Sequence, residues 1–303
     1  MPTPSWRDHV RGPFSGSIGW EDVAARIDAH SVDGDPPAMR EAFARLMLGA
    51  SGQPDLGTAE TLGGIDALRV TPAERTHEGT AVWLHGGGYV FGSPETHLRP
   101  AAALAEALGV DVVLPRYRLA PEHPWPAQRD DALAAVRAVQ ANGPVVLAGD
   151  SAGGHLALVT ALALADDDAP VRALALFSPN TDRTGQSHTR EANMPRDPMN
   201  ADEDDRQLAA LTFPHHADDD PEVSPLLADL SRLPRTHIEV GAREVLLDDS
   251  RLLAGRAHAL GAAVSLHVEP RAFHMWQLWT PWLHEADASI ARAAACLREA
   301  LAA

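Results

Sequence analysis

A serine between two glycines is the feature of this sequence that most directly suggests chemistry. Gly149-Asp150-Ser151-Ala152-Gly153 follows a short apolar run and precedes an apolar-periodic segment. This G-x-S-x-G pattern is typical of a nucleophile held on a sharp turn between a strand and a helix. Side chains at positions 149 and 153 would collide with the neighbouring strand and helix, so both positions suit glycine. We therefore expect Ser151 to be a nucleophile, with an ordinary tight turn as the alternative.

A glycine-rich stretch, "WLHGGGYVFGS" at residues 83–93, follows another apolar run well before the serine. Glycines there let the backbone turn back and present bare N–H groups to a substrate oxygen, which is how an oxyanion hole is built. A glycine-rich turn without function is the alternative. A phosphate-binding loop is disfavoured, because the sequence contains no lysine and the spacing fits neither the P-loop nor the dinucleotide fingerprint.

The hydrophobic pattern indicates the elements that would position these residues. Short apolar runs predict strands at 58–62, 65–71, 80–85, 110–115, 144–149, 172–178, 235–241 and 263–269. Helix-length segments lie between the later runs, at 96–109, 127–141, 151–165 and 248–261, and a last one at 282–301. Strands that alternate with helices predict an α/β fold with a mostly parallel sheet covered on both faces.

Two regions depart from this alternation. Residues 1–55 carry two helical patterns before any strand, and residues 179–228 are rich in Pro, Asp, Asn and Met with one helical stretch near 202–213. We predict that they meet as a cap over the carboxyl edge of the sheet, where ligands bind in open α/β sheets. A disordered acidic loop at 190–220 is the alternative.

Composition excludes several other classes. The chain has 303 residues, 45% of them hydrophobic, and a net charge of -17, which argues against nucleic acid or an anionic membrane as partner. The sequence shows neither a membrane-length apolar segment nor a signal-peptide core, so we expect a soluble cytoplasmic protein. The single cysteine, Cys296, is expected to be a buried structural thiol. His215 and His216, although near Asp218–Asp220, lack metal-ligand spacing, and we expect no metal.

Four motifs in one order carry a resemblance to a known family: "HGGGY" at 85–89, "YRLAPEHPWPA" at 117–127, "GDSAGG" at 149–154 and "SPLLADL" at 224–230. From about residue 60 to 300 the chain resembles the hormone-sensitive-lipase-like esterases, bacterial family IV, of the α/β-hydrolase superfamily. The resemblance implies an eight-stranded α/β-hydrolase core with a helical cap, and ester hydrolysis without metal or cofactor. It also implies that the backbone amides of Gly87, Gly88 and Ala152 form the oxyanion hole, and that Glu122 braces the HGGG loop.

The base and the acid follow from the order Ser, acid, His of this fold. His274 comes after the last predicted strand and a short loop, which is the position that the base requires. The acid should follow the strand at 235–241, where Glu244, Asp248 and Asp249 are available. The family's spacing of two acidic positions favours Glu244 as the triad acid with Asp248 in support. This is a departure from the commoner aspartate.

These residues predict a serine carboxylesterase whose substrate is a small-molecule ester. The resemblance implies short- to medium-chain acyl esters, aryl esters included. A lactone hydrolase, an amide hydrolase or a deacetylase of a small metabolite would use the same residues and remains an alternative. Ser151, His274 and an acid are all present, which disfavours a non-catalytic receptor. Homodimers are frequent among such esterases, but the sequence identifies no interface. Trp276, Trp279 and Trp282 are expected to pack the core against the cap, with an aromatic pocket wall as the alternative.

Overall fold

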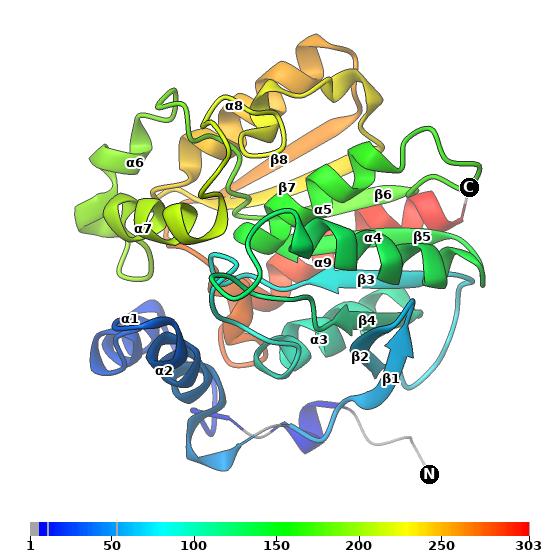
Figure 1. Ribbon diagram of the computed structural model, residues 1–303. Coiled ribbons are helices and arrows are strands. Elements are labelled where there is room, and N and C mark those ends of the chain that lie inside the picture. The colour runs from blue at the N-terminus through cyan, green and yellow to red at the C-terminus, as the bar shows by residue number, and fades with distance from the viewer. Residues whose placement is uncertain (1–5, 11, 53, 303) are drawn as a thin grey trace.

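The computed structural model describes residues 6–10, 12–52 and 54–302. Eight strands within these ranges form one sheet in the order β1-β2-β4-β3-β5-β6-β7-β8 (Figure 1). Strands β1, β2 and β4 pair antiparallel, and every pair from β4 through β3 to β8 is parallel. The predicted eight-stranded, mostly parallel sheet is therefore confirmed. The strands are β1 (Thr58–Leu62), β2 (Ile65–Val70), β3 (Thr80–Leu84), β4 (Asp111–Pro115), β5 (Val145–Asp150), β6 (Ala173–Phe177), β7 (Arg235–Gly241) and β8 (Val264–Glu269).

Helices cover both faces of this sheet. On one face α3 (Leu98–Leu108) and α9 (His284–Leu301) pack together over the middle strands. On the other face lie α4 (Ala127–Gln140), α5 (Ala152–Ala163) and α8 (Leu247–Ala259). Every residue of β4, β5 and β6 is buried, because a parallel strand covered on two faces has no exposed side. This burial explains why these strands read as nearly continuous apolar runs.

Two helical segments lie outside the alternation of strands and helices, as the sequence predicted. The first holds α1 (Trp20–Ala29) and α2 (Pro36–Leu48). The second, which we call the insertion (residues 179–228), holds α6 (Thr189–Ala192), α7 (Asp202–Thr212) and two 3-10 turns, Met194–Arg196 and Pro225–Leu227. Figure 1 shows both segments on the same side of the molecule. The insertion is helical where a disordered loop was the alternative. That the two segments form a cap stays a prediction, and residues 1–5, 11 and 53 of the first lie outside the described residues.

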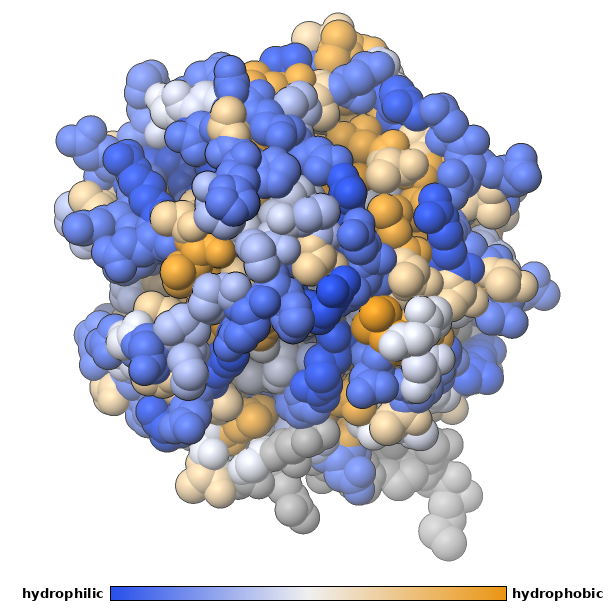
Figure 2. All heavy atoms as spheres, viewed as in Figure 1, coloured by the Kyte–Doolittle hydropathy of each residue, from blue (hydrophilic) through white to orange (hydrophobic). Residues whose placement is uncertain are grey.

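The surface and the remaining core fit this arrangement. Trp276, Trp279 and Trp282 are buried, and Phe14 of the N-terminal segment contacts the last two edge-on, with ring centroids 6.0 and 5.7 Å away. Cys296 is half-buried, not buried as expected, because α9 has an exposed side. The face in Figure 2 is mostly hydrophilic with scattered apolar groups. Among the described helices, none has the length and apolar character of a membrane span.

Candidate active site

Ser151 occupies a strained turn between β5 and α5. Its backbone has φ 55° and ψ -121°, a conformation that costs on the order of 1–3 kcal/mol for a residue with a side chain. The turn is held by the Ser151 N–H, which donates to the Phe177 carbonyl at 2.8 Å. A Cβ at Gly149 would overlap the Gly153 carbonyl, and one at Gly153 would overlap the Leu84 carbonyl. The predicted steric need for both glycines is thus confirmed.

His274 links the serine to a carboxylate. Its Nε2 lies 2.9 Å from Ser151 Oγ, and its Nδ1 lies 3.1 Å from Glu244 Oε2. Glu244 follows β7 and His274 follows β8, and both are buried. Because an ionised carboxylate only accepts, it holds the proton on Nδ1 and leaves Nε2 to accept from the serine hydroxyl. The three side chains predicted from the sequence are brought together in the order that proton transfer needs.

Glu244 is itself held in one orientation. Its Oε1 accepts from Ser178 Oγ at 2.8 Å and from the Gly241 N–H. These two donors fix which oxygen remains for the histidine. Ser178 follows β6 and has φ 49°, so a second strained residue faces the site. The role of Ser178 is not predictable from the sequence, because nothing in "LFSPN" shows that this serine will contact a residue that follows β7.

The pKa of His274 is raised above its ordinary value. Burial alone would lower it, but the hydrogen bond and the charge of Glu244 oppose burial and prevail, aided by the charges of Asp197 and Asp150. A raised pKa is what a histidine needs if it is to take up a proton from a much weaker acid and hold it as an imidazolium.

The two other acidic candidates lie elsewhere. Asp248 accepts from the Thr189 N–H at 3.2 Å and from Arg251 at 3.4 Å, and its side chain is partly exposed. Asp249 is fully buried and accepts from the backbone N–H groups of Thr181 and Asp182. Neither carboxylate has a hydrogen bond to His274 within the described ranges. The acid expected to support the triad, Asp248, contacts the insertion instead.

The glycine-rich loop after β3 carries free backbone donors. Gly87 and Gly88 have φ 117° and 58°, and a Cβ at Gly88 would overlap Leu208 of α7. In the part of the chain that the structure describes, the N–H groups of Gly87, Gly88 and Ala152 donate to no protein acceptor. Ala152 is the first residue of α5, where the N–H has no partner inside the helix. Three backbone N–H groups without a protein acceptor can together bind a negatively charged oxygen.

The stretch at 117–127 braces this loop. Tyr117 donates from its hydroxyl to the His85 carbonyl at 2.6 Å and stacks on the His85 ring at 4.2 Å between centroids. Burial lowers the pKa of His85 to about 3, so its ring is neutral and structural at ordinary pH. The expected bracing role of Glu122 is indirect. It pairs with Arg40 of α2 at 2.6 Å, and Arg40 donates to the Val90 carbonyl at 2.8 Å.

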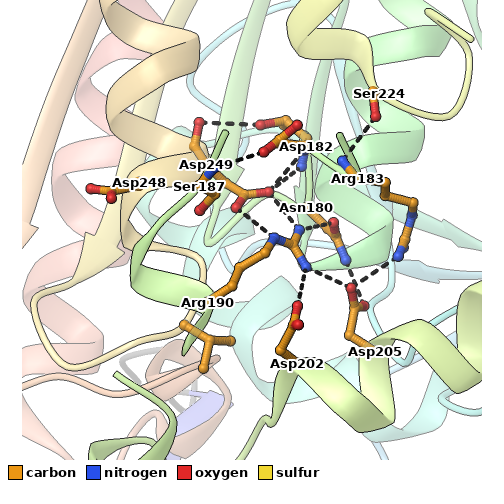
Figure 3. A network of polar contacts seen from close by, with 12 residues as sticks. Asn180, Asp182, Arg183, Ser187, Arg190, Asp202, Asp205, Ser224, Asp248 and Asp249 are labelled. Carbon is orange, nitrogen blue, oxygen red and sulfur yellow. Dashed lines mark hydrogen bonds and ion pairs between the residues drawn. The ribbon is translucent and has the colours of Figure 1, made fainter. Parts of the chain in front are cut away.

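A buried ionic network anchors the insertion to α8 (Figure 3). Arg190 of α6 pairs with Asp205 of α7 and with Asp249 of α8, each at 2.8 Å, and donates to Asn180 at 2.7 Å. Arg183 pairs with Asp205 at 2.9 Å. The charges of the two arginines hold the pKa of Asp205 well below its usual range, although burial opposes them. The network ties both helices of the insertion to the helix that follows Glu244.

A cavity of about 480 Å³ lies between the N-terminal helices and the insertion. Its apolar lining includes Met39, Phe91, Met199 and Leu208. Phe91 and Leu208 are also the residues that lie against Gly87 and Gly88, so the cavity adjoins the loop that carries the free amides. No group of three or more His, Cys, Asp or Glu in the described ranges is arranged to hold a metal ion.

Comparisons with known proteins agree with this geometry. A family model described as the alpha/beta hydrolase fold matches residues 81–278. An acetyl-hydrolase of Streptomyces hygroscopicus is 37% identical over 285 residues, which cover 90% of this chain and 93% of that one. The carboxylesterase NlhH of Mycobacterium tuberculosis is 33% identical over 270 residues, or 82% of this chain and 84% of that one.

Solved structures give the same picture. An esterase from the bacterial hormone-sensitive lipase family superposes with a TM-score of 0.87 at 33% identity, over 93% of this chain and 97% of that one. A hormone-sensitive lipase from a metagenome library superposes with a TM-score of 0.86 at 30% identity, over 95% of this chain and all of that one. Since these matches cover 93% and 95% of the chain, the similarity extends beyond the sheet to much of the insertion and of the N-terminal segment.

Proposed function

The chain belongs to the α/β-hydrolase family, among its hormone-sensitive-lipase-like esterases, and we propose that it hydrolyses short- to medium-chain acyl esters, aryl esters included. In this proposal the catalytic residues are Ser151, His274 and Glu244. It is a carboxylic ester hydrolase, and its substrate is a small-molecule ester. The observation that carries the assignment of residues is the hydrogen-bonded chain from Ser151 Oγ through His274 to Glu244, at 2.9 and 3.1 Å.

The reaction follows from which atoms face one another. Ser151 Oγ attacks the ester carbonyl as His274 Nε2 takes its proton, and Glu244 stabilises the imidazolium. The carbonyl oxygen becomes an oxyanion that accepts from the N–H groups of Gly87, Gly88 and Ala152. His274 then gives its proton to the leaving alkoxide, and the alcohol departs from the acyl-enzyme. Water deprotonated by His274 attacks the acyl carbon, and the carboxylic acid leaves as the proton returns to Ser151.

The preference for short and medium acyl chains is supported by the cavity and by one relative. The cavity beside the glycine-rich loop is about 480 Å³, and its mixed lining includes apolar side chains such as Met39 and Phe91, which suit a modest acyl or aryl group. The relative that is 37% identical is named an acetyl-hydrolase, which keeps deacetylation of a small metabolite as a second candidate. Lactone and amide hydrolysis would use the same residues. The helices on either side of this cavity form the proposed cap.

Hydrolysis of nitrophenyl esters tests this proposal. The acyl series runs from acetate through butyrate and octanoate to palmitate, with wild type and Ser151→Ala measured side by side. We expect turnover to be highest for the short and middle esters and to be lost in Ser151→Ala. Wild-type turnover that rises towards palmitate would refute the chain-length proposal. Turnover that survives in a folded Ser151→Ala protein would refute the nucleophile.

Two further expectations remain predictions. One is the cytoplasmic location and the other is a homodimer, which light scattering coupled to gel filtration would test.

A further inference from the structure

Asp197 joins three segments that meet beside the triad. It lies in the insertion, directly after the turn Met194–Arg196, and is 7% exposed. Its Oδ1 accepts from the backbone N–H of His274 at 3.3 Å and of Met199 at 3.1 Å, and its Oδ2 accepts from the N–H of Val245 at 3.1 Å. One side chain of the insertion therefore holds the base and the residue next to the triad acid.

The contacts explain why this residue is an aspartate. All three partners are N–H donors, and an ionised carboxylate offers acceptors on both oxygens. Asparagine could accept at Oδ1 from His274 and Met199, but its amino group would then face the Val245 N–H, donor against donor. A buried donor left without a partner destabilises the folded state. The site thus selects a carboxylate although burial disfavours its charge.

The insertion also contacts the acid-bearing loop through other residues. Asn193 donates to the Glu244 carbonyl at 2.8 Å, and Thr189 donates from its hydroxyl to the Val245 carbonyl at 3.0 Å. These contacts fix the loop that carries Glu244 but do not reach the loop that carries His274. Asp197 adds that second connection, so it sets the base relative to the acid.

The charges around Asp197 make its effect measurable. Burial raises the pKa of the Asp197 carboxyl to about 6, the charge of Glu244 acts in the same direction, and His274 opposes both. In return, the negative charge of Asp197 raises the pKa of His274. The other titratable groups that line the adjoining cavity are Asp28, His30, Asp33 and Asp204. His274 and Glu244 face Asp197 from the loops that it joins.

We propose that Asp197 is a positioning residue that locks the loops of His274 and Glu244 to the insertion, so that the base lies between Ser151 and Glu244 only while the insertion is docked. This inference rests on the proposed function of Ser151 and His274. Asp197 does not touch the reacting atoms. It acts through the backbone of His274 and through its charge.

The test is Asp197→Asn, with kcat and KM for nitrophenyl butyrate measured across the pH range in which the enzyme is stable. We expect kcat to fall by about 10- to 100-fold, as for a small misplacement of a reacting group, while KM changes less than about threefold. We also expect the acid limb of kcat/KM to move to lower pH, by about one unit, because a negative charge beside the imidazolium is lost. Asp197→Ser, smaller and uncharged, replaces the variant if it does not fold.

The matched control is Asp202→Asn. Asp202 is a buried carboxylate of the same insertion, and it pairs with Arg190 and Arg206 instead of facing the triad. We expect Asp202→Asn to have a lower melting temperature than wild type and an unchanged acid limb of the kcat/KM profile. Wild-type kcat and an unmoved acid limb in folded Asp197→Asn would overturn the inference, as would a loss of kcat that only follows a loss of folded protein. If wild type itself shows no ester turnover, it is the proposed function that fails.

Discussion

Replacing Glu244 by glutamine should abolish the basicity of His274 without removing any side-chain volume. Glu244 Oε1 accepts from Ser178 Oγ and from the Gly241 N–H. In Glu244→Gln these two donors select the amide oxygen for that position, which turns the amino group towards His274 Nδ1. The ring must then carry its proton on Nε2, and Nε2 can no longer accept from Ser151.

The expected loss of kcat in Glu244→Gln follows from losing the correct tautomer of His274. That loss costs about 10,000-fold in kcat in a serine triad, or about 5 kcal/mol of transition-state stabilisation. The comparison variant is Asp248→Asn, since Asp248 was the other candidate for the acid. Its contacts are with Thr189 and with Arg251, which is 52% exposed, and such pairs contribute about 0–1 kcal/mol. We expect Asp248→Asn to retain kcat within about twofold.

The assay is hydrolysis of nitrophenyl butyrate by both variants, with thermal melts to show that each is folded. A folded Glu244→Gln protein within about tenfold of wild type would refute the tautomer argument, because a wrong tautomer cannot be that active. A large loss in Asp248→Asn together with an active Glu244→Gln would move the acid to Asp248.

Three further predictions follow from the same geometry. Gly88→Ala should lower kcat by about 100-fold, because its Cβ would overlap Leu208 and displace an amide of the oxyanion hole, and adding Leu208→Ala should restore part of the loss in the same assay. Arg190→Ala should lower the melting temperature by roughly 10 °C, since it removes the cation that pairs with the fully buried Asp249, at a cost of about 3–5 kcal/mol. An unchanged melting curve would contradict that estimate. The kcat/KM profile should fall with decreasing pH through a pKa above 6.5, the ordinary value for histidine, because His274 must be neutral to accept a proton and its pKa is raised.

The parts of the fold that were predictable from the sequence are those that depend on the local hydrophobic pattern and on local steric constraints. Each of the eight predicted strands is present, with ends that differ by at most one residue, and the central ones are short apolar runs bounded by turn residues. Gly149 and Gly153 were predicted from a close approach of the neighbouring strand and helix, and in the structure a Cβ at either position meets backbone. The cysteine was less predictable, since the position of Cys296 depends on which side of α9 faces the sheet.

The glycine-rich loop shows how one motif depends on another. "HGGGY" predicted bare amides, and Gly87 and Gly88 have them. The support of that loop by Arg40 was not predictable, because α2 precedes the first strand and carries no motif. Only the folded chain brings Arg40 within 2.8 Å of the Val90 carbonyl. Glu122, expected to brace the loop, reaches it through that arginine.

The acidic run at 197–205 shows the limit most clearly. "DPMNADEDD" contains five carboxylates, and as composition it suggests a solvated loop. In the structure Asp197, Asp202 and Asp205 are buried, whereas Glu203 and Asp204 are exposed. A carboxylate can be buried only where donors replace water. Apart from the Met199 N–H, these donors lie outside the run and include Arg190, Arg183 and the backbone N–H groups of His274 and Val245. Hydrophobic periodicity and sequence motifs do not reveal a residue whose role depends on partners that are distant in the sequence. That is why the triad could be found from the sequence and the carboxylate that joins its loops could not.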